Sequence, residues 1–300
     1  NVGILTGMLN TSKRKALAVI NEVFNVPMSL GGLSNCETKI ADAIEKPCQV
    51  TVDYVRQQDI AHADETGWPR GNRKKGWLWT LVCATAAVFM VHPNRSKKAA
   101  RELIGNFAGK FVTDRYNAYD FYEFVRQICW AHLKRDFKAI SEASGELGKI
   151  GFELHELTKK ILKMRGRVRD GTLQWKTFQY RMPKLQKRVE SLLESGAGFD
   201  GKLSGKCREI LKHKECLWTF VKDQNVEPTN NCAEQIVRQG VIWRKISFGT
   251  QSDRGARYVE RILTVCATCR LQNRSIIEYL RQACHNHLNR MLAPDLVVNV

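Results

Sequence analysis

The sequence lacks a long apolar segment. No run of about 18 apolar residues, the length that crosses a bilayer, occurs in the 300 residues, and no signal-peptide pattern opens the chain. Internal repeats and low-complexity tracts are absent as well. These absences argue against a membrane-spanning or secreted protein and predict a globular protein of the cytoplasm.

The missing secretory signal also bears on the cysteines. Ten cysteines are scattered along the chain and do not form a compact framework, so we expect reduced thiols. The chain begins at Asn1 and not at Met, which suggests a processed product, a truncated chain or the ordered part of a longer protein. Its length and its 43% hydrophobic content allow one large domain with an insertion, or two domains.

Acidic residues are scarce relative to basic ones. The 48 Lys and Arg against 30 Asp and Glu give a formal net charge of +18. This charge exceeds what solubility needs and indicates a polyanionic partner. An anionic membrane surface would attract it too, but without an apolar segment nucleic acid is the favoured partner.

Residues 1–57 have the pattern of a helical region. Ser12 is placed to cap a first helix, Pro27 interrupts the run, Ser29 is placed to cap a second helix, and Pro47 is expected to close it. A helix, a short turn and a helix suit a helix-turn-helix DNA reader, although helical pairs are also common packing units.

Residues 58–136 change to short apolar stretches that predict strands. The expected strands are 60–64, 77–84, 88–92, 111–113 and 125–131, and residues 96–107 have helical spacing. The first strands would form an antiparallel meander, and the helix would lead to a parallel fourth strand. The pattern therefore predicts an α/β fold with a mixed sheet and flanking helices.

Residues 137–227 again read as helices, which form an insertion before the chain resumes at 228–300 with further helices. Between Lys159 and Arg188 there are 11 Lys and Arg, and Asp170 is the only acid. This basic face could lie along DNA or could be an ordinary solvated helix surface.

Three acids stand at positions where a metal site could form. Asp64 would end the first strand, Asp114 would end the fourth, and Glu234 lies near a helix start announced by Pro228. Carboxylates from different elements can hold two Mg²⁺ or Mn²⁺ ions for phosphodiester chemistry. Each also has a structural interpretation: a strand end, a capped turn, and a capping box with Asn231.

Basic residues follow the third acid. They are candidates for sequence-independent contacts with DNA phosphates, or for a solvated loop: Arg238, Arg244, Lys245, Arg254 and Arg257. Trp68 and Trp243 could stack on a displaced base, although a place in the core is favoured.

Cys129 and His132 have the spacing of two zinc ligands, but no matching second pair follows. His132, expected at the end of a strand, could contact the scissile phosphate or hydrogen-bond locally. A structural or supporting role is favoured for both residues.

Four segments resemble, in order, the transposases of bacterial insertion-sequence family sixty-six. They are Ala63–Trp68, Thr113–Tyr119, Cys129–Phe137 and Asn230–Glu234, followed by Arg244–Lys245 and Phe248–Gly249. The likeness extends from about residue 10 to 290. It implies a ribonuclease-H-like five-stranded mixed sheet with a helical insertion, and it implies that Asp64, Asp114 and Glu234 are the metal-binding triad.

The resemblance also implies an activity. In such DDE enzymes a water hydrolyses one strand at the transposon end, and the freed 3′-hydroxyl then attacks target DNA. Two Mg²⁺ or Mn²⁺ ions, a homo-oligomer on DNA, small accessory proteins and a bacterial, nucleoid-associated location would follow. Ile128 and Gln235 depart from the glycine and arginine usual in the family, and the N-terminal segment usual there is not visible.

Two other functions fit the same features. A nuclease of the same fold would cut DNA without joining it. A catalytically inactive, basic DNA-binding regulator would keep the fold and the charge alone.

Overall fold

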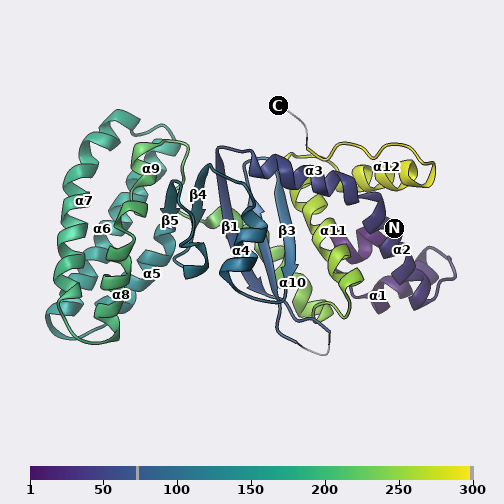
Figure 1. The fold of residues 1–300 in the computed structure, drawn as a ribbon, viewed down its shortest axis with the longest axis horizontal. Coiled ribbons are helices and arrows are strands. Elements are labelled where there is room, and N and C mark those ends of the chain that lie inside the picture. The colour runs from purple at the N-terminus through teal and green to yellow at the C-terminus, as the bar shows by residue number, and fades with distance from the viewer. Residues whose placement is uncertain (72–73, 298–300) are drawn as a thin grey trace. The chain divides into compact units, whose positions relative to one another are not determined.

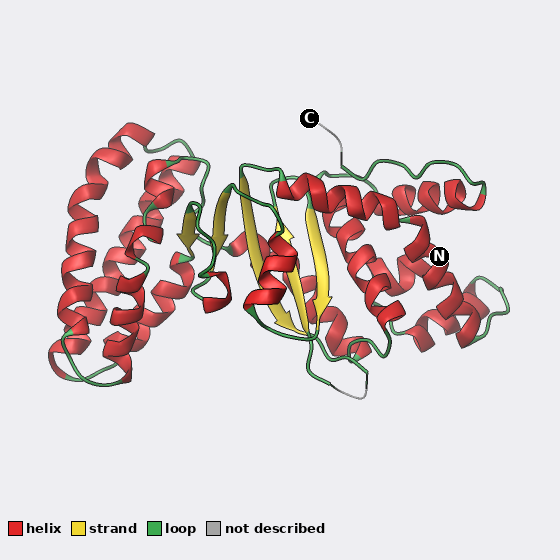
Figure 2. Cartoon of the chain, viewed as in Figure 1, coloured by secondary structure: helices red, strands yellow, loops and turns green. Residues whose placement is uncertain are grey.

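The computed structural model describes residues 1–71 and 74–297. Five strands form a mixed sheet in the order β3-β2-β1-β4-β5: β1 (Ile60–Gly67), β2 (Trp77–Val82), β3 (Ala87–His92), β4 (Lys110–Thr113) and β5 (Arg126–Ile128). Helices flank these strands (Figure 2). The predicted α/β class is confirmed, and the arrangement is consistent with a ribonuclease-H-like fold.

The chain divides into two compact units. The first unit comprises Asn1–Gly109, Asn117–Phe121 and Asn231–Val300, and the second comprises Lys110–Tyr116 and Tyr122–Asn230. Within the described residues, no helix combines the length and the apolar character that crossing a membrane requires.

The first unit is built on an antiparallel meander of β1, β2 and β3. On one face lie α10 (Asn231–Ser247) and α11 (Asp253–Leu271) (Figure 1). Their apolar side chains share one hydrophobic core with Leu78, Val82 and Phe89 of the strands. The other face is covered by α4 (Lys97–Ile104) and the short 3₁₀ helix η3 (Asn117–Tyr119).

The N-terminal helices pack onto this unit. They are η1 (Gly3–Met8), α1 (Lys13–Ala18), η2 (Val19–Val23), α2 (Leu30–Ala43) and α3 (Glu45–Arg56), and α12 (Ile276–Leu288) lies beside α2. The predicted caps are confirmed, since Ser12 accepts from the amide of Lys15 and Ser29 from that of Gly32. Pro47 was expected to end a helix, which is wrong: it lies in the first turn of α3, where its missing N–H costs no hydrogen bond.

The second unit joins a parallel strand pair, β4 and β5, to a helical bundle. The helices are α5 (Trp130–Ser141), α6 (Gly145–Arg169), α7 (Trp175–Ala197), α8 (Lys202–Lys212), η4 (Lys214–Cys216) and α9 (Thr219–Lys222). The two long helices α6 and α7 are joined by a short turn (Figure 1). Gly171 lies in this turn with a φ of +79°. The expected strand over 125–131 is shorter, because Leu133, Phe137 and Ile140 already form a buried helical stripe from Trp130 onward.

Arg165 shows that the basic stretch from Lys159 to Arg188 does not direct all its charge to solvent. This side chain is buried in α6 and donates to the carbonyl of Gln224 at 2.7 Å and to Glu227 Oε1 at 3.2 Å. It therefore fastens the segment through which the chain leaves the bundle.

Replacing Arg165 by methionine is expected to lower the free energy of unfolding by about 2 kcal/mol, because the buried guanidinium loses its hydrogen bonds to the Gln224 carbonyl and to Glu227. Denaturant unfolding measures the change. Arg169→Met is the matched control, since Arg169 is exposed on the same helix and should shift stability by less than about 0.5 kcal/mol. Equal losses of unfolding free energy in the two variants would contradict this stabilising role of Arg165.

Candidate active site

Asp64 lies in the middle of β1 and not at its end. The ladder with β2 continues beyond it, pairing Thr66 with Leu78 and Gly67 with Trp77, so the predicted strand end at Asp64 is wrong. The local sequence misleads because Glu65 and Thr66 are polar, yet both have partners across the ladder. Asp64 is half-buried, and its Oδ1 accepts the Glu65 N–H at 2.9 Å.

Helix α10 lies on the sheet face to which Asp64 belongs. At its C-terminal end, Arg244 Nη1 donates to Thr66 Oγ1 at 3.0 Å, and Thr66 shares the parity of Asp64 along β1. One turn earlier, a Cβ added to Gly240 would come within 2.2 Å of Leu78 Cδ2. The absence of a side chain at Gly240 therefore allows the helix to approach the strands closely.

The N-terminal end of α10 lies over the other end of the strands. Burial first, and then the neighbouring thiol of Cys83, raise the pKa of the Cys232 thiol. Cys83 follows Val82, which pairs with His62 of β1. Helix α10 thus runs along β1 from the level of His62 to that of Thr66, and the half-buried Glu234 stands in the first turns of this helix. Asp64 and Glu234 therefore belong to the same side of the first unit.

Asp114 belongs to the second unit and directly follows β4, as predicted. Its Oδ1 accepts the N–H of Tyr116 at 2.9 Å, which is the capped turn considered from sequence. Arg126 holds the backbone here, donating to the Asp114 carbonyl at 2.8 Å and to Thr113 Oγ1 at 2.9 Å. These contacts fix the conformation of the chain at Asp114.

Glu65 forms a buried polar cluster that sequence reasoning missed. Its carboxylate accepts two hydrogen bonds from Arg95, at 2.7 and 2.9 Å, and one from the Tyr119 hydroxyl at 2.5 Å. Arg95 also lies over the ring of Trp77. Glu65 points to the face opposite Asp64, in phase with the buried Ala61 and Ala63, and this alternation was the available signal. The cluster holds β1 beside the candidate acid.

His132 lies in the first turn of α5 and not at the end of a strand, so that expectation is wrong. Cys129 precedes the helix and is fully buried, and its Sγ accepts the backbone N–H of Asn230 at 3.1 Å. This contact gives Cys129 a structural role within the second unit. A zinc site at these residues stays a hypothesis.

The family model for "Transposase IS66 family" matches residues 14–258 of the chain. This match covers well over half of the sequence. The chain belongs to the IS66 family of transposases. The resemblance stated from the sequence is thereby confirmed.

Two curated proteins of Sinorhizobium fredii strain NBRC 101917 / NGR234 are similar to this IS66-family chain. The uncharacterized protein y4qI is 26% identical over 274 residues, covering 78% of this chain and 49% of that protein. The uncharacterized protein y4hP is 26% identical over 260 residues, covering 73% and 46%. The chain spans about half the length of the curated relatives it matches.

The candidate phosphate contacts of this IS66-family chain divide into two kinds. Arg244 is half-buried and binds to the end of β1, because its Nη1 also donates to the carbonyl of Gly67. The other four side chains are exposed: Arg238, Lys245, Arg254 and Arg257.

Both candidate stacking tryptophans lie in the core of the first unit. Trp68 is 1% exposed and donates from Nε1 to Thr250 Oγ1 at 3.1 Å, and Trp243 is 5% exposed and packs edge-on against Tyr258. The interpretation as core residues, which was favoured from sequence, is confirmed. Neither indole face is open to a base.

Proposed function

We propose that this chain is the catalytic core of a DDE-type DNA transposase, in which Asp64, Asp114 and Glu234 hold the divalent metal ions. The observation that carries the proposal is the path of α10 along the face of β1 that bears Asp64, which gives two acids distant in sequence a common side. Membership of a transposase family supports the same chemistry. The third acid, Asp114, contributes from a backbone fixed by Arg126.

The donor set suits Mg²⁺ or Mn²⁺. All three side chains offer hard carboxylate oxygens. All three are half-buried, so water solvates their carboxylates only in part. When bound, two such ions supply an activated water and neutralise charge on the phosphate and the leaving oxygen. The Glu65 amide orients the Asp64 carboxylate through its hydrogen bond to Oδ1.

The proposed reaction has two steps. Water displaces the 3′ oxygen of the transposon end from its phosphorus, which leaves a free 3′-hydroxyl. That hydroxyl then attacks a phosphodiester of target DNA and displaces its 3′ oxygen, so one bond forms for each bond broken. The role of the carboxylates is to bind and orient; no covalent protein–DNA intermediate is required.

DNA is the proposed partner. The exposed Arg238, Lys245, Arg254 and Arg257 would contact phosphates without reading sequence. Two transposon ends must be handled together, so we propose a homo-oligomer in the DNA complex, with small accessory proteins as further partners. The helical segment 137–227 is proposed as an insertion in this core.

Metal binding and strand joining test the proposal. Mn²⁺ soaked into crystals should give anomalous density at Asp64, Asp114 and Glu234, and none in crystals of Glu234→Gln. A pre-cut end carrying a 3′-hydroxyl should join to target plasmid in Mn²⁺ buffer. Cutting without joining would identify a nuclease, and DNA binding with neither metal density nor cutting would identify an inactive regulator.

A further inference from the structure

Phe248 is an exposed aromatic side chain in an unusual backbone conformation. It directly follows α10, it is 77% exposed, and its φ is +59°. Bulky residues rarely adopt this left-handed region, and such residues persist only where surrounding contacts impose them. Left-handed residues are common at the C-terminal end of a helix, so this conformation forms part of the cap of α10, and it leaves the phenyl ring exposed to solvent.

The contacts around Phe248 hold it in place. Its N–H donates to the carbonyl of Arg244 at 2.9 Å, and the amide of Thr250 donates to the carbonyl of Pro69 at 3.0 Å. Gly249 between them has a φ of +89°, and a Cβ there would lie 2.0 Å from the Pro69 oxygen. Segment 248–250 is therefore fastened against the chain that leaves β1, and the ring is presented outward by a built turn.

Two basic residues line the same hollow as the exposed ring. Phe248 lines a hollow of about 570 Å³ together with Lys13, Arg14 and Ile246, and Ile246 is itself 41% exposed. The one acid lining this hollow, Glu37, is paired with Lys13 at 2.5 Å. The surface thus joins apolar groups to positive charge, in a chain of net charge +18.

We infer that Phe248, supported by Ile246, is a base-stacking wedge that contacts DNA at a fixed distance from Glu234 of the same unit. Aromatic and aliphatic wedges unstack or stack on bases, while nearby cations hold the phosphates. This inference rests on the proposed function for the identity of the ligand. It assigns to Phe248 the stacking role that buried Trp68 and Trp243 cannot perform.

The helix sets the spacing. Phe248 comes 14 residues after Glu234 (248 − 234), directly after the end of α10, which corresponds to about 21 Å at 1.5 Å per residue. Base pairs stack about 3.4 Å apart, so this length corresponds to about six base pairs.

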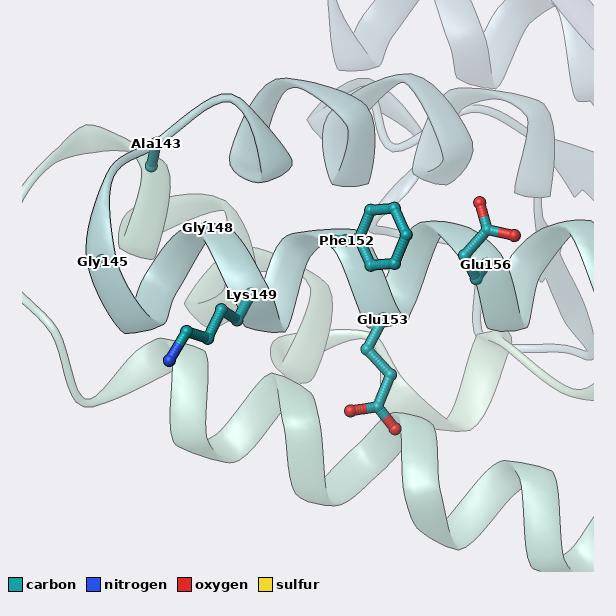
Figure 3. Close-up of a pocket in the computed structure, with 7 residues that line it drawn as sticks. All are labelled: Ala143, Gly145, Gly148, Lys149, Phe152, Glu153 and Glu156. Atoms are coloured by element: carbon teal, nitrogen blue, oxygen red, sulfur yellow. The ribbon is translucent and has the colours of Figure 1, made fainter.

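Phe152 offers a matched control. It is 62% exposed in the second unit, and it lines a hollow with Lys149, Glu153 and Glu156 (Figure 3), where acids outnumber the basic residue. An exposed phenylalanine by itself should therefore not contribute to DNA binding at this position.

Fluorescence anisotropy with labelled single-stranded dT20, in metal-free buffer, tests the wedge. Phe248→Ala should weaken binding about tenfold, the effect of losing one base–aromatic stack, with an unchanged slope against salt because phosphate contacts remain. Phe248→Trp should bind dT20 with the affinity of the wild type, because it keeps an aromatic ring. The fluorescence of the added indole should be quenched on binding. Phe152→Ala should bind like the wild type, and circular dichroism melting should show each variant folded.

Wild-type affinity in Phe248→Ala, or a loss equal to that of Phe152→Ala, would overturn the wedge. So would an altered oligomeric state with unaltered dT20 affinity, which would make this surface a contact between copies. Because the assay needs no catalysis, a failed wedge beside intact Mn²⁺-dependent cleavage refutes the wedge alone. If dT20 binding depends on Phe248 but the protein cuts no DNA, the proposed reaction alone is refuted.

Discussion

Asp64→Asn is expected to reduce Mn²⁺-dependent DNA cleavage and strand joining by about a thousandfold or more. The change replaces a charged metal ligand by a neutral one, and a metal site supplies several kcal/mol of transition-state stabilisation, at about 1.4 kcal/mol per tenfold in rate. Fold and stability should be retained, because asparagine keeps an oxygen that accepts the Glu65 N–H. Single-turnover cleavage of an end-bearing duplex gives the rate.

Asp59→Asn is the matched control for this prediction. Asp59 is exposed one residue before β1, so the same substitution there leaves the candidate site intact and should keep the wild-type rate. Binding of Mn²⁺, followed by the loss of the free-ion electron paramagnetic resonance signal, should weaken in Asp64→Asn only. Unchanged cleavage by Asp64→Asn would remove this acid from the mechanism and favour a DNA-binding function without catalysis.

Glu260→Gln is expected to stabilise the protein at alkaline pH by up to about 3 kcal/mol. Glu260 lies on α11 and accepts the N–H of Val91 at 2.6 Å. Burial raises the pKa of its carboxyl from 4.5 to about 7, against the lowering effects of that hydrogen bond and of Arg261 and Arg257. The folded chain therefore binds this proton more tightly than the unfolded chain does.

The sign of the pH dependence follows from this difference. Below pH 4.5 both states are protonated and the contribution is fully present; between pH 4.5 and 7 it is lost by about 1.4 kcal/mol per pH unit. Above the folded pKa the loss is complete. Glutamine keeps the acceptor for Val91 and cannot ionise, so the variant should match the wild type near pH 4.5 and exceed it at pH 8.

Urea unfolding of both proteins from pH 5 to 8 measures the difference. Glu278→Gln serves as the control, because Glu278 is exposed on α12 and its hydrogen bond with Arg281 lowers its pKa. That variant should gain nothing at pH 8. Parallel stability curves for the wild type and Glu260→Gln would show that Glu260 does not titrate as described.

The candidate site was partly readable from the sequence. Asp64, Asp114 and Glu234 could be selected because each stands in a recognisable segment, and the helix that carries Glu234 was announced by Pro228. The position of α10 on the Asp64 face of β1 could not be read, because it depends on Gly240 meeting Leu78 across the core. The outward turn of Phe248 likewise depends on Pro69.

Two polar residues show why burial was hard to anticipate. Glu65 looks like a second surface acid beside Asp64, yet its partners Arg95 and Tyr119 come from elements 30 and 54 residues away. Arg165 looks like one charge among many in a basic run, yet its acceptors lie on the returning chain. The burial of each side chain could be recognised only once the position of its partners in the fold was known.

The sequence by itself determined the secondary structure of most segments, the excess of positive charge and the IS66 family, because caps, periodicity and short motifs depend on residues close together along the chain. Only the tertiary structure decided which side chains are covered. It buried Trp68 and Trp243, engaged Arg244 with β1 and exposed Phe248. Burial depends on elements that are distant in sequence, and no local pattern encodes which of them will meet.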